Sequence, residues 1–395
     1  MYSRRITASA LSAIILRCGL HYGRIFGVID FGVQRTDRGL LAPKREGFKC
    51  FCILFRVVLV GLYLYYAYSM HLSDFYLELL SSIHIVGCLT CTVFILLLQF
   101  WYGERVLRIV NSFLRLFRRV RTLTATSAKT SGSYNGYGCT REFVLLLLKA
   151  VSICYEVGCQ FPLMWASHTV HEFLGTFCNM YVTIGSLIVM HIGFVGYLSV
   201  GALYSEINSY VRHELCHKLR SLERLGGNRP SSRRLRSVGN RLDECIGIYD
   251  AIQRLGSSFH KFYELPLCLS MLFHFLTMIL VSYEVILRSK FRSFTLLFLV
   301  IKLFVDAALI TLAAHGAVSS SRLVRRIGVE NCYVSEDNEW HMKMELFLNR
   351  LNIYEFRVRP LGLFELSNEL ILVFLSAMVT YHTYIIQFGL QSHQI

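Results

Sequence analysis

The chain has 395 residues, of which 54% are hydrophobic and only 17% are charged. Soluble domains are about 45–50% apolar and about 25% charged, so this composition argues against an ordinary soluble enzyme and against a disordered protein. Its 41 Lys and Arg residues against 26 Asp and Glu residues give a net charge of +15. In a membrane protein such an excess of Lys and Arg marks the loops that stay in the cytoplasm. We therefore expect the protein to contact membrane lipid and not nucleic acid.

The apolar segments, taken in chain order, predict membrane-spanning helices. The first, Ile6–Leu16, is too short to span a bilayer and is followed by no cleavage site, so it predicts neither a span nor a cleaved signal peptide. Seven later segments have the roughly 20 apolar residues that a spanning helix needs. They are Phe51–Met70, Ile83–Phe100, Val144–Ala166, Phe177–Leu203, Leu267–Leu287, Thr295–Ala317 and Ile371–Gln391.

The connections between these segments form two alternating sets that differ in charge. Residues 1–50, 101–142, 204–266 and 322–370 hold 35 Lys and Arg residues, whereas the other connections and the tail at 392–395 hold three. Because connections rich in Lys and Arg stay in the cytoplasm, the sequence predicts a cytoplasmic N-terminus and an extracellular C-terminus. The fold class that we expect is therefore an all-α polytopic membrane protein with seven transmembrane helices.

This topology divides the chain into five parts. We expect a cytoplasmic segment at 1–50, the first six transmembrane helices within 51–321, with cytoplasmic loops at 101–142 and 204–266, and a cytoplasmic segment at 322–370. The last transmembrane helix follows at 371–391, and an extracellular tail at 392–395. Mixed apolar patterns in Val211–Leu225 and Leu242–Phe259 further predict that spans four and five continue as helices below the membrane.

The ionisable residues inside the predicted spans are the candidates for a functional interior, because such groups usually face the protein or a water-filled cavity. Lys302 and Asp306 are four residues apart, so they share a helix face as a structural ion pair or as the lining of a polar ligand cavity. Arg56 and Lys149 lie near the cytoplasmic ends of their spans and are expected to extend toward the membrane surface. The residues expected near an outward-facing pocket are Tyr181, Tyr283, Glu284, Lys302 and Asp306.

The segment before the last span has one apolar helical face. Met344, Phe347, Leu348 and Leu351 recur at helical spacing, which predicts an amphipathic helix. We expect this helix to pack against other cytoplasmic helices and to form a subunit contact.

The thirteen cysteines and the histidines lack the spacing of a metal site. No arrangement of a nucleophile with a base stands out either. The sequence therefore predicts no metal, no cofactor and no enzymatic activity.

The last span carries a stripe of polar residues on an otherwise apolar helix. Such a stripe suits either hydrogen bonding between helices or the wall of a pore. Its members at helical spacing are Ser376, Thr380, Thr383 or Tyr384, Gln387 and Gln391.

The same span carries a family resemblance. The string TYHTYIIQF, in which Thr380-Tyr381 and Gln387-Phe388 flank five residues, resembles the C-terminal signature of insect gustatory receptors. His382, Thr383 and Tyr384 are more polar than the hydrophobic residues that this signature usually has between its two pairs. The preceding stretch PLGLFELSNELILVFLSAMV, the chain length and the predicted topology also resemble the family.

The resemblance implies a ligand-gated cation channel made of four subunits, identical or mixed, in the plasma membrane of sensory neurons. The last span would line the pore, with Gln387 and Phe388 at the gate and Thr380 and Tyr381 deeper in the span. The helix before it would anchor the tetramer. A small-molecule tastant would bind among spans two to six, and a bitter or otherwise aversive compound is the expected class.

Two other functions remain open at this stage. A G-protein-coupled receptor also has seven spans, but its N-terminus is extracellular, and its usual Asp-Arg-Tyr and Asn-Pro-x-x-Tyr motifs are absent here. A secondary transporter normally shows internal repeats with interrupted helices, and none stands out in this sequence.

Overall fold

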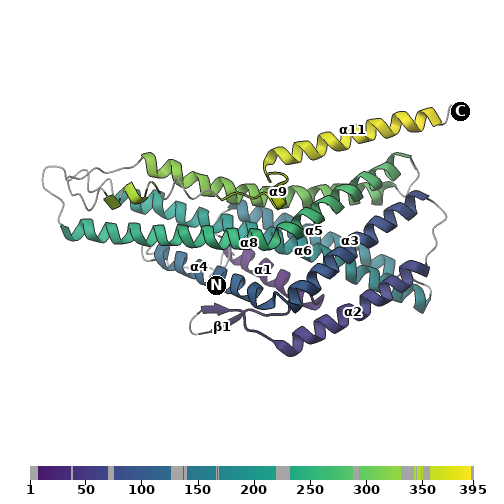
Figure 1. Ribbon diagram of the computed structural model, residues 1–395, viewed down its shortest axis with the longest axis horizontal. Coiled ribbons are helices and arrows are strands. Elements are labelled where there is room, and N and C mark those ends of the chain that lie inside the picture. Colours follow the sequence, from purple (N-terminus) through teal and green to yellow (C-terminus); the bar gives the residue numbers. More distant parts are fainter. Residues whose placement is uncertain are drawn as a thin grey trace, which may run out of the picture.

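The protein is an elongated bundle of long helices (Figure 1). A computed structural model describes residues 8–36, 39–69, 75–125, 137, 140–165, 167, 169–218, 232–287, 293–330, 342–343, 345–347, 349 and 356–392. Its helices are α1 (Ala8–Ile25), α2 (Glu46–Ser69), α3 (Phe75–Phe100), α4 (Gly103–Ala125), α5 (Thr140–Trp165), α6 (Val170–Tyr210), α8 (Ser232–Leu287), α9 (Ser293–Glu330) and α11 (Asn368–Ser392). Four short elements accompany them: the antiparallel strands β1 (Gln34–Thr36) and β2 (Gly39–Leu41), the π-helical turn η1 (Val211–Leu215) and the 3-10 turn η2 (Pro360–Gly362).

Each of the seven predicted spans lies within a single helix, apart from Met70 and Ala166, which fall outside the described residues. Among the described residues, five stretches are long and apolar enough to cross a membrane. These are Glu46–Tyr68, Ser81–Phe100, Val170–Lys218, Arg236–Ile279 and Leu297–Leu323. The all-α membrane class is thus confirmed, while the count of seven spans and the orientation of the termini stay predictions.

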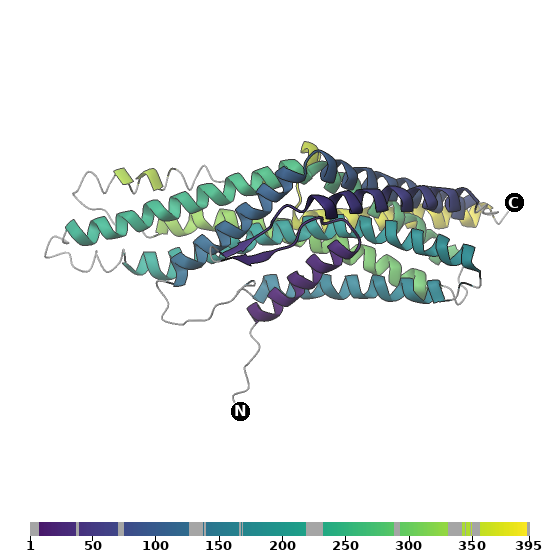
Figure 2. The same ribbon diagram turned by 90° about the horizontal axis from the view of Figure 1, so that it is seen from below.

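Helix α6 forms the centre of the bundle and is the most buried of these membrane-capable helices. It packs most extensively on α9, and α8 runs beside both (Figures 1 and 2). At about 1.5 Å per residue, α6 is about 60 Å long and α8 about 85 Å, whereas a bilayer core is about 30 Å thick. Helical structure continues past the predicted fourth span as far as Lys218 and precedes the predicted fifth span from Ser232, while the placement of these extensions below the membrane stays a prediction.

The N-terminal helix α1 packs mainly against α5. Side chains of α6 also reach it, because a Cβ atom at Gly19 would come within 2.9 Å of His191 and one at Gly23 within 3.6 Å of Ile188. The two glycines leave room for these side chains. The apolar run that the sequence shows at 6–16 therefore belongs largely to a longer helix that lies against the bundle.

The segment that leaves α1 is held by two polar side chains of α2 and α3. Arg56 donates a hydrogen bond from Nη2 to the carbonyl oxygen of Phe26 over 2.7 Å, and Gln99 donates from Nε2 to the carbonyl oxygen of Gly27 over 2.7 Å. Arg56 is fully buried, with its guanidinium 5.2 Å from the ring centre of Tyr181. The expectation that Arg56 extends toward the membrane surface is wrong, because Phe26, in the segment that follows α1, supplies a carbonyl partner in the interior.

Helix α4 occupies much of the predicted loop at 101–142. Its buried residues Leu116, Val120 and Leu123 lie on one helical face, which packs with α6 and α8. Its arginines lie largely on other faces, as in an ordinary amphipathic helix.

The last helix, α11, is attached to the bundle near its beginning. The preceding residues Phe356, Val358 and Leu366 are buried in the main core, and Phe374 of α11 packs 5.4 Å from Phe275 of α8, measured between ring centres. The helix then diverges from its neighbours toward the C-terminus (Figure 1).

The closest approach of α6 and α9 gives a prediction about stability. A Cβ atom at Gly201 would lie 3.4 Å from the backbone nitrogen of Ala317, whereas one at Gly61 on α2 would meet nothing within 4 Å. Overfilling a packed core costs about 1–3 kcal/mol. We expect Gly201→Leu to lower the thermal unfolding temperature of the purified protein by several degrees, while Gly61→Leu leaves it unchanged. Equal behaviour of the two variants would contradict this packing.

Candidate functional sites in the bundle and on the last helix

Four charged side chains of α5 and α9 form a buried network. Lys149 Nζ lies 2.5 Å from Asp306 Oδ1, and Lys302 Nζ lies 2.5 Å from Glu156 Oε2. Lys302 Nζ is also 3.2 Å from Asp306 Oδ2, which confirms the predicted pairing four residues apart. Ser152 adds a hydrogen bond of 2.8 Å from its hydroxyl to Asp306 Oδ1.

The arrangement follows from helical spacing on both helices. Lys149, Ser152 and Glu156 are three and four residues apart, so they share one face of α5, as Lys302 and Asp306 share one face of α9. The two helices are antiparallel at this contact, because the earlier residue of α5 pairs with the later residue of α9. The expectation that Lys149 extends toward the membrane surface is wrong, because Asp306 provides an interior partner.

The network is electrically balanced and closed to large ligands in this structure. Its two ammonium groups and two carboxylates cancel, and all four side chains are buried. The cavity beside it measures about 10 Å³, which is about the space of one water molecule. Tyr22 of α1 and His191 of α6 also line it, so α1 covers the network on one side.

The other predicted pocket residues do not join this cavity. Tyr181 is buried in a separate cluster with Leu59, Tyr63 and Cys178, beside Arg56. The side chains of Tyr283 and Glu284 lie outside the described residues. The structure thus groups Lys302 with Asp306 and places Tyr181 elsewhere, and the predicted ligand pocket stays a prediction. Among the described residues, no group of three or more His, Cys, Asp or Glu side chains is placed to hold a metal ion.

The predicted pore residues lie on the part of α11 that diverges from the bundle. Ser376, Thr380, Tyr381, Thr383 and Gln387 are all exposed in the single subunit. The Thr383 hydroxyl donates over 2.9 Å to the carbonyl oxygen of Val379 within its own helix. The polar stripe is therefore exposed in the single subunit, as are apolar residues of the same helix such as Val379, and the side chain of Gln391 lies outside the described residues. The side chain of Phe388 lies outside the described residues.

The predicted anchor helix is described in part. Phe347 is buried in the main core, whereas Met344, Leu348 and Leu351 lie outside the described residues. Lys343 Nζ lies 3.7 Å from Asp243 Oδ2 of α8, so this segment lies beside the early part of α8.

A histidine that the sequence did not single out connects three parts of the bundle. His260 of α8 forms a hydrogen bond of 2.9 Å through Nδ1 with the Tyr197 hydroxyl of α6. Its Nε2 accepts a hydrogen bond of 3.2 Å from the backbone N–H of Arg359, in the segment before α11. A single histidine has no sequence signal that distinguishes this role.

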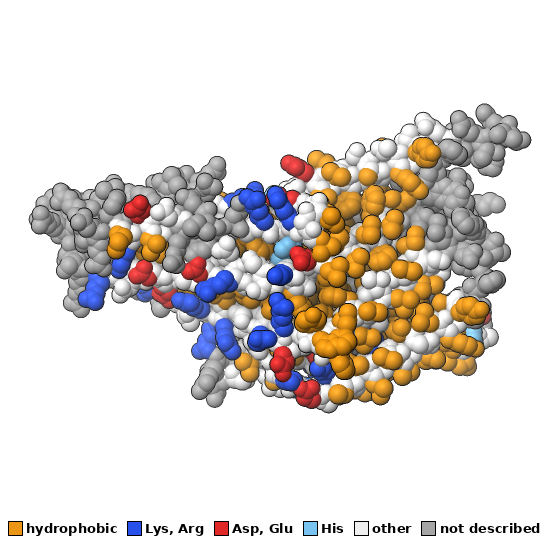
Figure 3. Space-filling model, in the orientation of Figure 1, with side chains coloured by type: hydrophobic (Ala, Val, Ile, Leu, Met, Phe, Trp, Pro, Cys, Tyr) orange, Lys and Arg blue, Asp and Glu red, His pale blue; other side chains and the backbone are white. Residues whose placement is uncertain are grey.

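Apolar side chains gather over one part of the surface, where α2, α3 and α11 lie, and Lys and Arg side chains gather at its border (Figures 1 and 3). Exposed residues of α2 such as Leu54, Val57 and Tyr65 contribute to it. A soluble monomer rarely exposes a contiguous apolar surface of this kind. A bundle that buries four charged side chains between two helices and exposes a broad apolar surface has the features of a helical membrane protein.

The comparison with known sequences then gives the family. The profile of the family described as 7tm Chemosensory receptor matches residues 16–392. The chain belongs to this chemosensory receptor family.

Its relatives in Drosophila melanogaster are gustatory receptors. The chain is 44% identical to putative gustatory receptor 93c, with 99% of each chain covered, and 42% identical to putative gustatory receptor 93b, with 99% and 97% covered. It is 25% identical to a gustatory receptor for bitter taste, 93a, over 73% of this chain and 70% of that one. The suspected gustatory receptor family is confirmed, and with it the prediction that the chain is a receptor and not an enzyme.

The buried network gives a second prediction. Removing one member of a buried ion pair leaves an uncompensated charge and costs about 3–5 kcal/mol. We expect Asp306→Asn to lower thermal stability and surface expression strongly, because two ammonium groups then face one carboxylate. The double variant Lys149→Met with Asp306→Asn, which restores the charge balance, should recover part of the loss.

The matched control is the surface pair of Lys44 with Glu104, whose nitrogen and oxygen atoms are 3.0 Å apart and whose side chains are 47% and 75% exposed. Glu104→Gln should change stability little, because water screens exposed pairs. Thermal unfolding in detergent measures all three variants. An Asp306→Asn variant as stable as Glu104→Gln would show that the network is not required.

Proposed function

We propose that the chain is a subunit of a ligand-gated cation channel in which α11 lines the pore. The observation that carries this proposal is the polar stripe of α11, which is exposed along a helix that diverges from its own bundle. Exposed polar side chains on a membrane helix need partners or water. A central water-filled pore between subunits supplies that water.

The proposed assembly is a tetramer of this chain, alone or with other gustatory receptors. Four copies of α11 would place Gln387 and Phe388 around the axis at the gate, with Thr380 and Tyr381 deeper in the pore. A ring of Phe side chains closes a pore by dewetting, and amide groups contact hydrated cations without binding them tightly. Met344, Leu348 and Leu351 belong to the proposed anchor between subunits, while Phe347, which is buried in the core of its own subunit, would hold this segment to the bundle.

We assign all seven apolar helices as spans, with the N-terminus in the cytoplasm, the C-terminus outside, and the plasma membrane of sensory neurons as the location. Helix α5 is the third span even though it carries Lys149 and Glu156, because both are neutralised by α9. The strong bias of Lys and Arg between the two sets of connections supports the orientation.

The proposed ligand is a small-molecule tastant, of the bitter or otherwise aversive class. The relative named as a receptor for bitter taste supports this class. Binding among spans two to six would require the interior near Lys302 and Asp306 to open, because its cavity holds about one water molecule in this structure.

A G-protein-coupled receptor or a secondary transporter remains the alternative. Neither needs a polar stripe on a helix that stands apart from its own bundle. Extracellular labelling of a tag at Met1, with none at Ile395, would favour a G-protein-coupled receptor.

Substitutions at the proposed gate give a third prediction. We expect Phe388→Ala to raise the ligand-independent current, because a smaller side chain lowers the barrier to wetting of the pore. Gln387→Glu should raise the permeability of divalent relative to monovalent cations several-fold, because it places a ring of carboxylates in the pore. Whole-cell currents and reversal potentials, normalised to surface expression, measure both effects.

The matched control is Gln34→Glu, the same chemical change at an exposed position of β1. It should leave the reversal potential unchanged. If Phe388→Ala and Gln387→Glu reach the surface with unaltered basal current and selectivity, α11 does not line the pore.

A further inference from the structure

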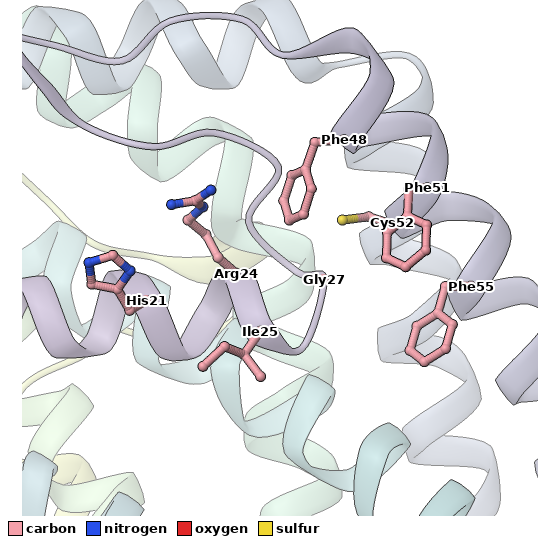
Figure 4. Close-up of a pocket in the computed structure, with 8 residues that line it drawn as sticks. All are labelled: His21, Arg24, Ile25, Gly27, Phe48, Phe51, Cys52 and Phe55. Carbon is pink, nitrogen blue, oxygen red and sulfur yellow. The ribbon is translucent and has the colours of Figure 1, made fainter.

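A groove of about 350 Å³ lies between the end of α1 and the first turns of α2 (Figure 4). This volume is within the range of small-molecule sites, about 300–1,000 Å³. The groove is separate from the charged network between α5 and α9 and from the stripe on α11. Its lining residues are His21, Arg24, Ile25, Gly27, Phe48, Phe51, Cys52 and Phe55.

The lining is cationic on one side and aromatic on the other. His21 and Arg24 come from α1, whereas Phe48, Phe51 and Phe55 come from α2 (Figure 4). This pairing of a basic edge with an apolar wall matches an amphiphile that carries an anionic group.

Arg24 is placed to receive an anion. Its guanidinium carbon lies 5.4 Å from the ring centre of Phe48, so the aromatic ring covers part of the guanidinium group. The Nε atom of Arg24 is buried and has no hydrogen-bond partner among the described residues. The Arg24 side chain as a whole is only half-buried and lines the groove, and a guanidinium group binds phosphate oxygens readily.

The groove also opens on the surface that lipids contact. Phe51 is 60% exposed, and Leu54 and Val58 of the same helix are exposed with it. The first two turns of α2 begin the apolar stretch Glu46–Tyr68, so the groove lies where a membrane's headgroups give way to its hydrocarbon. An occupant of the groove would be continuous with the bilayer.

We propose that this groove binds an anionic glycerophospholipid. The phosphate lies against Arg24 and His21, and an acyl chain follows the wall formed by Phe51 and Phe55. Juxtamembrane cations attract the anionic lipids of the cytoplasmic leaflet, on which the predicted orientation places this end of α2. The site is additional to the pore and to the tastant pocket.

Native mass spectrometry of the full-length protein in detergent tests this site. The protein is titrated with phosphatidylserine, phosphatidylcholine or glycerol 3-phosphate, and bound lipid is counted per subunit. One cation near an anionic headgroup contributes about five- to tenfold in affinity. We expect phosphatidylserine to bind more tightly than phosphatidylcholine, and Arg24→Gln to weaken phosphatidylserine binding by about that factor. Phe51→Ser should weaken the binding of both lipids.

The matched control is Arg17→Gln, the same change on the exposed side of α1 and outside the groove. It should retain wild-type binding.

Phe51 is largely exposed, so Phe51→Ser decides the test if Arg24→Gln does not fold. Equal affinity for the two lipids, or wild-type binding in the groove variants, would overturn the proposal. Glycerol 3-phosphate that binds as tightly as the lipid would overturn the assignment to a lipid. Because binding is read directly, these outcomes do not depend on channel activity.

Discussion

The charged network between α5 and α9 is the interaction that constrains the rest of the bundle. An uncompensated charge within a membrane is costly, so Lys149 and Lys302 must each meet a carboxylate. The two pairs are separated by about two turns on α5 and one turn on α9, which leaves little freedom to slide one helix along the other. Since α9 also packs closely on α6 at Gly201, the register of these three helices is determined together.

That rigid centre contrasts with α11. The segment before α11 is held through the backbone of Arg359 by His260, which also contacts Tyr197 of α6. Arg359 and Glu365 form a further ion pair of 2.9 Å close to the start of α11. Beyond Phe374 most of the described side chains of the helix are exposed in the single subunit. A movement of α6 relative to α8 would thus be transmitted directly to the first turns of α11. The rest of α11 would move with these turns, because it continues them as one helix.

Hydropathy predicted the helices because a spanning helix must be apolar over its whole length, which is a local property of the sequence. The Lys302–Asp306 pair was predictable for the same reason, since both residues lie on one helix. The partners of Lys149 and Arg56 were not, because they come from α9 and from the segment after α1, which are distant in sequence. Helix α4 has a local amphipathic pattern, but it is rich in arginine and low in hydropathy. A hydropathy criterion for membrane spans therefore does not distinguish it from a loop. The exposure of α11 could not be predicted, since hydropathy does not distinguish a lipid-facing helix from a pore helix.

Helix α1 joins the interior of the bundle to its lipid surface. Tyr22 of α1 lines the cavity beside the charged network. Two residues later along the same helix, Arg24 lies at the groove beside α2. A helix of this length moves largely as a unit, so an occupant that holds Arg24 also holds Tyr22 over the network. Opening the interior to the proposed tastant on this side would require α1 to shift, and the proposed lipid at its end would oppose that shift.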